Sequence, residues 1–351
     1  MVHPFPLADD EALDAWTQPW DALAHRSGAL VFSSPAWVGA WRAVMEPEAR
    51  VVLLVDGPVD DPSGLLPLAR LRQRLHPRLA VTVPYWGIAG SGLGAADHLG
   101  PVAVDPAALD RLVDASPRVA GRGAALVLAN VAPAAQAAAA RLARSTPVAT
   151  TTVSGMSLEG VERAEALWSK KLAGNLRRAR RLLAEDGYGT TWYRLGRDDH
   201  GRLAEHGRLH ALRWSAVGRP GLFDERRQRF LAELAGRLRA PDGVWQVLVE
   251  REGSAIGSGI VLRYGSTVCT YSTGRDPAAG DRSIGPGLHE AAIRWALEAG
   301  ATRYEFLRGV EEHKRRLGGR PSEDVTYVVG RSPAAELLRL RAGLLRRRDA
   351  R

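Results

Sequence analysis

The sequence predicts an α/β protein (α+β class) with two domains, each built around a mixed, mostly antiparallel sheet flanked by helices. A chain of 351 residues is longer than a typical single domain, and helix-like and strand-like runs alternate in both halves. A stretch containing threonine and proline at 145–153 separates the halves and indicates a linker. We therefore expect a first domain at 1–153, a second at 154–333 and a basic C-terminal tail at 334–351.

In the first half, apolar residues recur with helical spacing in some segments and with strand spacing in others. Ser34 and Pro35 form a typical helix start, with serine as the cap and proline in the first turn. Helices are predicted at 11–26, 36–45, 107–115 and 133–144, and strands at 50–56, 65–71, 79–84, 98–104 and 124–130. The glycine-rich residues 86–97 follow neither period and are predicted to form a loop.

The second half begins with a basic amphipathic helix. Its apolar residues recur every three or four positions and share one face: Leu172, Leu176, Ala179 and Leu183. The other faces carry Lys170, Lys171, Arg177, Arg178, Arg180 and Arg181. This pattern is typical of a solvated helix, and contact with RNA or phosphate is the alternative. Further strands are predicted at 190–195, 244–250, 255–264, 267–273, 303–307 and 325–329, and further helices at 203–216, 225–239 and 288–299.

Composition limits the classes of function. The formal net charge is +9, and only three of the 48 basic residues are lysine. A positive net charge fits anionic ligands but does not distinguish among coenzymes, nucleic acid and acidic partners. The single cysteine, Cys269, excludes a disulfide framework and a cysteine metal site, and the histidines show no metal spacing. No signal peptide or membrane-spanning run is visible, so we expect a cytoplasmic protein.

The residues Arg282-Ser-Ile-Gly285-Pro-Gly287 lie between the strand-like run 267–273 and the helix-like run 288–299. A glycine-rich turn that opens a helix leaves backbone N–H groups unpaired at the positive end of the helix dipole. The sequence therefore predicts an anion-binding turn. The residues expected to bind the anion are Arg282, Ser283, Ile284, Gly285, Gly287 and Leu288.

The same pattern occurs once more, as Arg118-Val-Ala-Gly121-Arg-Gly123. That copy follows a helix-like segment and precedes the strand-like run 124–130. A phosphate cradle needs the opposite order, so residues 118–123 are predicted to be a helix-to-strand turn.

Arg-x-x-Gly-x-Gly is also the pyrophosphate-loop pattern of the GNAT acyltransferases. The sequence from Tyr271 onward resembles the CelD/BioF2-like branch of that superfamily, which is related to the FemABX aminoacyl transferases. The matching elements are Asp276-Pro277, Gly285 and Gly287, Glu305-Phe-Leu-Arg308-Gly309 and His313-Lys314, together with 32–37, 175–178 and 212–223.

The resemblance implies tandem GNAT-like domains, the first degenerate and the second carrying the cofactor loop. It implies acetyl-CoA or another acyl-CoA as the acyl donor, no metal, and a small-molecule or sugar-type amine as the acceptor. In this fold a backbone N–H of the splayed strand before the loop, here within about 269–273, polarises the thioester carbonyl. The function expected is N-acyl transfer.

Candidate catalytic residues follow from the same resemblance. Glu305 and His313 are expected as the general base, although the family usually has Asp and Tyr at these positions. For either residue, a structural ion pair with Arg308 or Lys314 is the alternative. Tyr271 is a candidate general acid, with a core position as the alternative. The expected substrate-binding residues are His210, Arg213, Trp214, Arg308 and Lys314.

Two further functions stay open at this point. A FemABX-like transferase would take its acyl group from aminoacylated tRNA, which the basic helix and the net charge favour, and a carrier protein is also a possible partner. A non-catalytic scaffold would keep the fold for partner binding alone. The sequence does not fix the oligomeric state.

Overall fold

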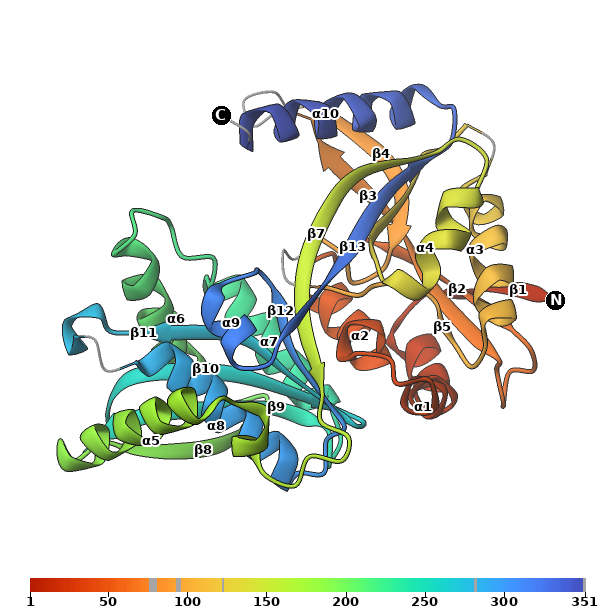
Figure 1. The fold of residues 1–351 in the computed structure, drawn as a ribbon. Coiled ribbons are helices and arrows are strands. Elements are labelled where there is room, and N and C mark those ends of the chain that lie inside the picture. The colour runs from red at the N-terminus through yellow and green to blue at the C-terminus, as the bar shows by residue number, and fades with distance from the viewer. Residues whose placement is uncertain (76–80, 93–95, 122, 281–282, 350–351) are drawn as a thin grey trace. The chain divides into compact units, whose positions relative to one another are not determined.

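A computed structural model describes residues 1–75, 81–92, 96–121, 123–280 and 283–349 (Figure 1). The chain divides into two compact units. Unit 1 comprises residues 1–42, 46–152 and 322–351, and unit 2 comprises residues 43–45 and 153–321. The mixed α/β class predicted from the sequence is confirmed.

Unit 1 is a mostly antiparallel sheet with helices. Its sheet runs in the order β1-β2-β3-β4-β6-β13-β7, with the short β5 on β3, and only β4 and β6 pair in parallel among the register pairs that the described residues show. The strands are β1 (Val2–Leu7), β2 (Arg50–Asp56), β3 (Gly64–Arg74), β4 (Thr82–Ile88), β5 (Val102–Ala103), β6 (Leu126–Val131), β7 (Ser145–Ser157) and β13 (Arg320–Val329). The helices are α1 (Asp10–Ser27), α2 (Pro35–Val44), α3 (Pro106–Ala120), α4 (Pro133–Arg141) and α10 (Pro333–Asp349).

Two segments of unit 1 differ from the sequence prediction. The expected linker at 145–153 is instead the first part of β7, because its threonines and valines favour a paired, extended backbone. The structure groups 322–351 with unit 1, whereas the sequence placed strand 325–329 in the second domain. The expected tail is α10, whose Ala335 and Leu338 are buried with Val83 and Val328.

The second Arg-x-x-Gly-x-Gly copy begins in the last turn of helix α3, with Arg118 inside the helix. Gly121 caps that helix, and its N–H group donates to the carbonyl of Pro117. The chain then continues to β6. This order gives a helix-to-strand turn rather than a phosphate cradle.

Unit 2 contains the strand order β7-β12-β11-β10-β9-β8. Its pairs are antiparallel except for β11 and β12, which run in parallel. The strands are β8 (Gly189–Leu195), β9 (Gly243–Arg251), β10 (Ser254–Tyr264), β11 (Thr267–Arg275) and β12 (Arg303–Arg308). The helices are α5 (Lys170–Glu185), α6 (His200–Ser215), α7 (Glu225–Arg237), α8 (Ile284–Glu298) and the short α9 (Glu312–Arg316).

Helices α6 and α8 cover opposite faces of this sheet. On β10, Gly257 lies against Ile284 of α8, whereas the next residue, Ser258, contacts His206 of α6. Successive strand residues point to opposite faces, so the two helices must lie on different sides. Glycine at 257 leaves the room that the Ile284 side chain occupies.

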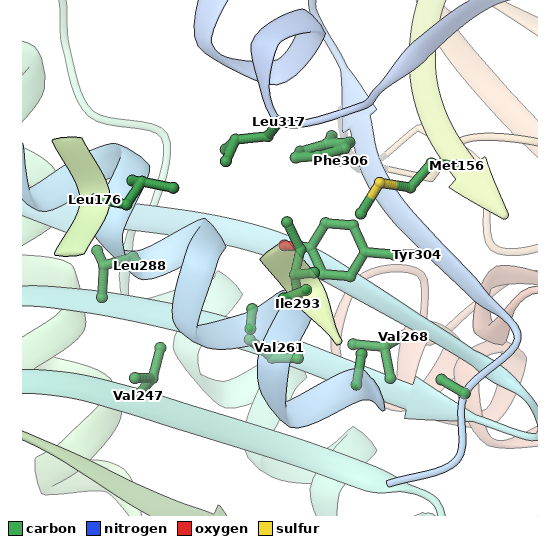
Figure 2. Close-up of a cluster of buried hydrophobic side chains, with 14 of the residues drawn as sticks. Met156, Leu176, Val247, Val261, Val268, Leu288, Ile293, Tyr304, Phe306 and Leu317 are labelled. Atoms are coloured by element: carbon green, nitrogen blue, oxygen red, sulfur yellow. The ribbon is translucent and has the colours of Figure 1, made fainter. Parts of the chain in front are cut away.

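The α8 face of the sheet carries the main hydrophobic core of unit 2 (Figure 2). Leu288 and Ile293 of α8 pack there with Val247, Val261 and Val268 of the strands. These α8 side chains recur along one face of the helix, which explains why the helix docks in this register. The packing fixes the first turn of α8 against the end of β11.

Candidate active site

Strand β11 contains a β-bulge at Tyr271. Its neighbours Thr270 and Ser272 pair with two consecutive residues of β10, Val261 and Ile260, so Tyr271 is the extra residue. A bulge re-aims the side chains around it. As a result Thr270 contacts Tyr304 in the core on the α8 side, while Ser272 faces His206 and His210 of α6.

The bulge coincides with the point where β11 and β12 part. The two strands pair only over Thr267–Cys269 and Arg303–Glu305. Beyond Glu305, β12 continues in its pairing with β7. The parallel pair therefore separates within 269–273, the segment in which the sequence placed the splayed strand.

A cluster of polar side chains lies where strands β11 and β12 begin to separate. The hydroxyl groups of Thr270 and Tyr304 lie 2.5 Å apart, and Nδ1 of His289 lies 3.1 Å from the Tyr304 hydroxyl. Burial lowers the pKa of His289 well below its ordinary value, so its ring is neutral near pH 7. The cluster joins β11, β12 and α8 at the level where the strands part.

Helix α8 begins next to the end of β11 with an unusual first turn. Ser283 precedes the helix in a left-handed conformation, with φ 54°, and its side chain makes no capping hydrogen bond. Ile284 and Gly285 are the first helical residues, so their N–H groups have no partner within the helix. Pro286 has no N–H group, and the Gly287 N–H donates to the Ser283 carbonyl. The first turn thus presents fewer amides than the sequence predicted.

A cavity of about 420 Å³ opens at this first turn. Its lining residues come from the C-terminal end of α6 and the residues after it, the end of β11, the start of α8 and helix α9. Its lining residues are Arg213, Trp214, Ala216, Val217, Thr273, Gly274, Arg275, Ser283, Ile284, Gly285, Pro286 and His313. A Cβ atom added to Gly285 would meet nothing within 4 Å, so this glycine leaves open space at the wall.

The described lining of this cavity is positively charged and includes no acidic residue. Arg213 extends from α6 and donates to the Thr273 carbonyl at 3.1 Å. Burial lowers the pKa of Arg213, and the nearby charge of Arg275 lowers it further, while Glu311 acts in the opposite direction. Two guanidinium groups and a helix N-terminus therefore face a space without a counter-charge, an arrangement that favours an anionic ligand.

Two lining residues offer further hydrogen-bonding groups. The indole Nε1 of Trp214 is buried and has no hydrogen-bond acceptor among the residues that the structure describes. Buried donors are normally satisfied, so this group fits an acceptor on a bound molecule. Burial lowers the pKa of His313, partly offset by Glu311, so the His313 ring is neutral near pH 7 and can accept a proton.

Several predicted site residues lie on this cavity and others do not. Arg213, Trp214, Ser283, Ile284, Gly285 and His313 line it. Arg282 falls outside the described residues. Leu288 is 1% exposed within the α8 core, and Gly287 lines a different cavity of about 240 Å³ on the other flank of α8. His210 is buried behind Trp214, with ring centroids 6.0 Å apart.

The predicted base Glu305 is not part of the cavity lining. It is 1% exposed, and its carboxylate accepts a hydrogen bond from Arg303 at 2.6 Å. Gly155 of β7 lies opposite and leaves room for this carboxylate. The structure therefore places Glu305 in an ion pair, though with Arg303 rather than with the expected Arg308 or Lys314.

Lys314 and Arg308 hold the chain after β12 rather than line the cavity. The Lys314 ammonium donates to the Arg308 carbonyl at 2.5 Å and pairs with Glu311 at 3.0 Å. Lys314 is 6% exposed, so little of it can reach a substrate. Tyr271, the third catalytic candidate, is the bulge residue described above and is half-buried.

A hydrogen-bonded histidine network between α6 and the sheet was not predicted. It joins His206, Ser258, Ser272 and His210, and burial lowers the pKa of both histidines. The available signal was the four-residue spacing of His206 and His210, which puts both rings on one face of a helix. Thr273 and Arg275, which line the cavity, were also missed.

Comparison with known proteins agrees with this geometry. Residues 170–315 match the family model described as an acetyltransferase (GNAT) domain. Over these residues the chain is therefore similar to GNAT acetyltransferases. No curated protein sequence matches the chain.

Solved structures extend the likeness in fold to nearly the whole length of the chain. The crystal structure of FemX has a TM-score of 0.65 at 13% identity, covering 92% of this chain and 98% of the other. The C-terminal domain of a protein named as a lysylphosphatidylglycerol synthetase from Agrobacterium fabrum has a TM-score of 0.58 at 13% identity, covering 96% and 97%. L-PGS from Bacillus licheniformis has a TM-score of 0.56 at 13% identity, covering 94% and 95%. At this identity the likeness shows the fold.

Two negative findings apply to the described part of the chain. No group of three or more metal-ligating side chains is assembled within it. None of its helices combines the length and apolar character needed to cross a bilayer.

Proposed function

We propose that this GNAT domain transfers an acyl group from a coenzyme A thioester to an amine acceptor. The observation that carries the proposal is the cationic cavity at the start of α8. The Ile284 and Gly285 amides, Arg213 and Arg275 would hold the donor's diphosphate there. The separated strands β11 and β12 would receive the thioester arm.

In the reaction, the amine nitrogen attacks the thioester carbonyl carbon, the carbon–sulfur bond breaks, and the amine loses a proton. His313 is the lining group able to accept that proton, because its ring is neutral near pH 7. The resemblance to the CelD/BioF2-like branch favours acetyl as the acyl group, a small-molecule or sugar-type amine as acceptor, and a cytoplasmic location.

Calorimetric titration with acetyl-CoA tests the donor. We expect one site per chain and a micromolar dissociation constant, weakened in Arg213→Ala. Release of free CoA in the presence of a panel of amines then tests the transfer. If acetyl-CoA at millimolar concentration gives neither heat of binding nor a rise in melting temperature, the CoA-donor proposal is wrong.

One observation favours a second donor. Helix α5 exposes Lys170, Lys171, Arg177 and Arg178, and these four have no acidic partner among the described residues. Such a helix fits the phosphates of aminoacylated tRNA, the donor of the FemABX relatives. Binding of aminoacylated tRNA at about 50 mM salt, weakened by the double substitution Arg177→Ala and Arg178→Ala, would support this donor. Absence of binding and of aminoacyl transfer would exclude it.

A further inference from the structure

The outer face of helix α10 is a stripe of exposed leucines. Leu337, Leu340 and Leu344 follow one another at spacings of three and four residues, so they share one face of the helix. Their exposed fractions are 41%, 65% and 67%, and the adjacent Leu345 is 41% exposed. Single apolar residues on a surface are ordinary, whereas a continuous apolar stripe indicates a surface that contacts a partner.

The opposite face of α10 is anchored to unit 1. Leu338 is 7% exposed within a hydrophobic cluster that includes residues of β4, β7 and β13. The Arg339 guanidinium donates to the Gly330 carbonyl at 2.8 Å, and that of Arg341 donates to the Arg74 carbonyl at 3.1 Å. These contacts fix the rotation of the helix about its axis. The leucine stripe is therefore held away from the core of unit 1.

The same helix has a strong positive charge. It contains five arginines and two acidic residues, Glu336 and Asp349. Glu336 is paired with Arg339 at 2.6 Å. Three consecutive arginines at 346–348 follow the leucine stripe directly in the sequence. An apolar face and a cluster of positive charge thus belong to the last turns of one helix.

These two properties together select the class of partner. Two copies of the leucine stripe could cover each other, but they would also bring two arginine clusters together, and like charges repel. A nucleic acid would pair with the arginines and leave the leucines in water. An anionic lipid surface matches both features, because it offers phosphates to the arginines and acyl chains to the leucines.

We propose that helix α10 docks the protein on an anionic lipid surface. The helix lies in the plane of the surface, with the leucine stripe at the boundary of the acyl chains and the arginines among the headgroups. Binding by one such helix is reversible, and it depends on the fraction of anionic lipid and on salt. This role is independent of the acyl transfer proposed above.

Flotation of the full-length protein with lipid vesicles tests the proposal. At about 50 mM salt the protein should float with vesicles of phosphatidylglycerol and phosphatidylcholine in equal parts, and it should not float with phosphatidylcholine alone. The double substitution Leu340→Ser and Leu344→Ser should lower the partition coefficient about 10-fold or more, because both side chains leave water on binding. Val59→Ser removes an exposed apolar side chain elsewhere in unit 1 and is the matched control.

The electrostatic part of the proposal has its own variant. Arg346→Ala, Arg347→Ala and Arg348→Ala together should lower the partition coefficient about 10-fold or more. An increase to about 0.5 M salt should have a similar effect on the wild type, because it screens the attraction to the headgroups. All of these substitutions lie outside the core, so the variants should keep the melting temperature of the wild type.

A probe attached to the helix reports the docking face directly. Cys269 is 2% exposed, so an environment-sensitive thiol dye on Leu340→Cys labels position 340 selectively. Its emission should shift to shorter wavelengths when anionic vesicles are added. The same dye on Val59→Cys should show no shift.

Four results would overturn the proposal. They are no flotation of the wild type with anionic vesicles, equal flotation with neutral vesicles, binding that the leucine variant retains in full, and no spectral shift at position 340. Retained binding would assign the lipid contact to another surface. A dimer in sedimentation velocity without lipid, lost in the leucine variant, would show that a second copy of the chain covers the stripe instead.

Discussion

Burial partly removes the Arg213 guanidinium group from water, and few contacts within the protein compensate for the lost hydration. It donates to Thr273, and the nearest acidic influence on it comes from Glu311, which is already paired with Lys314. A guanidinium group in such a place gains most from an anionic ligand. Its position on the cavity wall therefore points to the donor's phosphates.

We predict that Arg213→Ala weakens acetyl-CoA binding about 10-fold, the loss of one charge-assisted hydrogen bond. Calorimetric titration of both proteins measures this change. Arg219→Ala, which removes an exposed arginine a short distance along the chain, should leave the affinity as in the wild type. Equal affinities in the wild type and Arg213→Ala would contradict the assignment.

His313 is predicted to act as the base for the amine. His313→Gln should lower kcat about 100-fold or more while acetyl-CoA affinity changes little. Burial and the neighbouring Lys314 and Arg213 lower the His313 pKa, and Glu311 opposes them. A base works only when unprotonated, so activity should fall as pH decreases through this lowered pKa. The acid limb of kcat against pH should have its midpoint below 6.5 and disappear in His313→Gln; a limb unchanged in the variant would exclude this role.

At the scale of the element, helix α8 keeps glycine where stability alone would favour alanine. Gly285 lies in the first turn, and a Cβ there would point into open cavity space. Glycine within a helix costs about 1 kcal/mol relative to alanine. The proposed diphosphate would need this space next to the backbone, and a glycine leaves it open.

We therefore predict opposite effects of Gly285→Ala on stability and on binding. The free energy of unfolding should rise by up to about 1 kcal/mol, whereas acetyl-CoA affinity should fall, because the methyl group occupies the space of the diphosphate. Gly174→Ala in α5, where a Cβ also meets nothing within 4 Å, is the control and should stabilise without affecting binding. Urea unfolding and calorimetry report the two quantities. Unimpaired binding in Gly285→Ala would contradict a diphosphate at this turn.

Elements with a strong local signal could be predicted from the sequence. Strand β2 has the predicted bounds of 50–56, and the meander leading to the glycine-rich turn occurs as expected. The first part of strand β7 was taken for a linker because its threonines read as polar loop residues, and only its place between β13 and β12 shows that it belongs to a sheet. Short elements such as β1 and α9 carry too few residues to show a period.

One part of the site was predictable from a single segment, whereas Arg213, Trp214 and His313 were predicted through the family resemblance. Ser283 to Gly285 belong to one glycine-rich turn, so their place on the cavity could be inferred from the pattern. Ser272 and His206 meet because a bulge turns one strand toward a helix 66 residues away in sequence. No local pattern encodes such a contact, which depends on the tertiary packing of α6 on β11.

At the scale of the whole molecule, burial lowers the pKa of four histidines within the described part of unit 2: His206, His210, His289 and His313. Burial is the largest cause in each case, and for His210 the pKa falls to about 4. Below the ordinary value of 6.5 the unfolded chain binds protons that the folded unit does not. Acidification therefore favours unfolding of this unit in particular.

We predict that the free energy of unfolding is level above about pH 7 and decreases as pH falls from 6.5 toward 4. His210 alone accounts for about 3 kcal/mol over that range. Urea unfolding at several pH values, followed by tryptophan fluorescence, measures the slope. His210→Asn should reduce the slope, since its amide does not titrate. A stability that is equal at pH 7 and pH 5 would show that the buried rings do not resist protonation.

The central claim is that the first turn of α8 binds the diphosphate of an acyl-CoA donor. A crystal structure of the protein with acetyl-CoA tests it most directly. We predict diphosphate oxygens within about 3.2 Å of the Ile284 and Gly285 amide nitrogens, with Arg213 beside them. A coenzyme bound elsewhere, or a cavity that stays without it at millimolar acetyl-CoA, would contradict the claim.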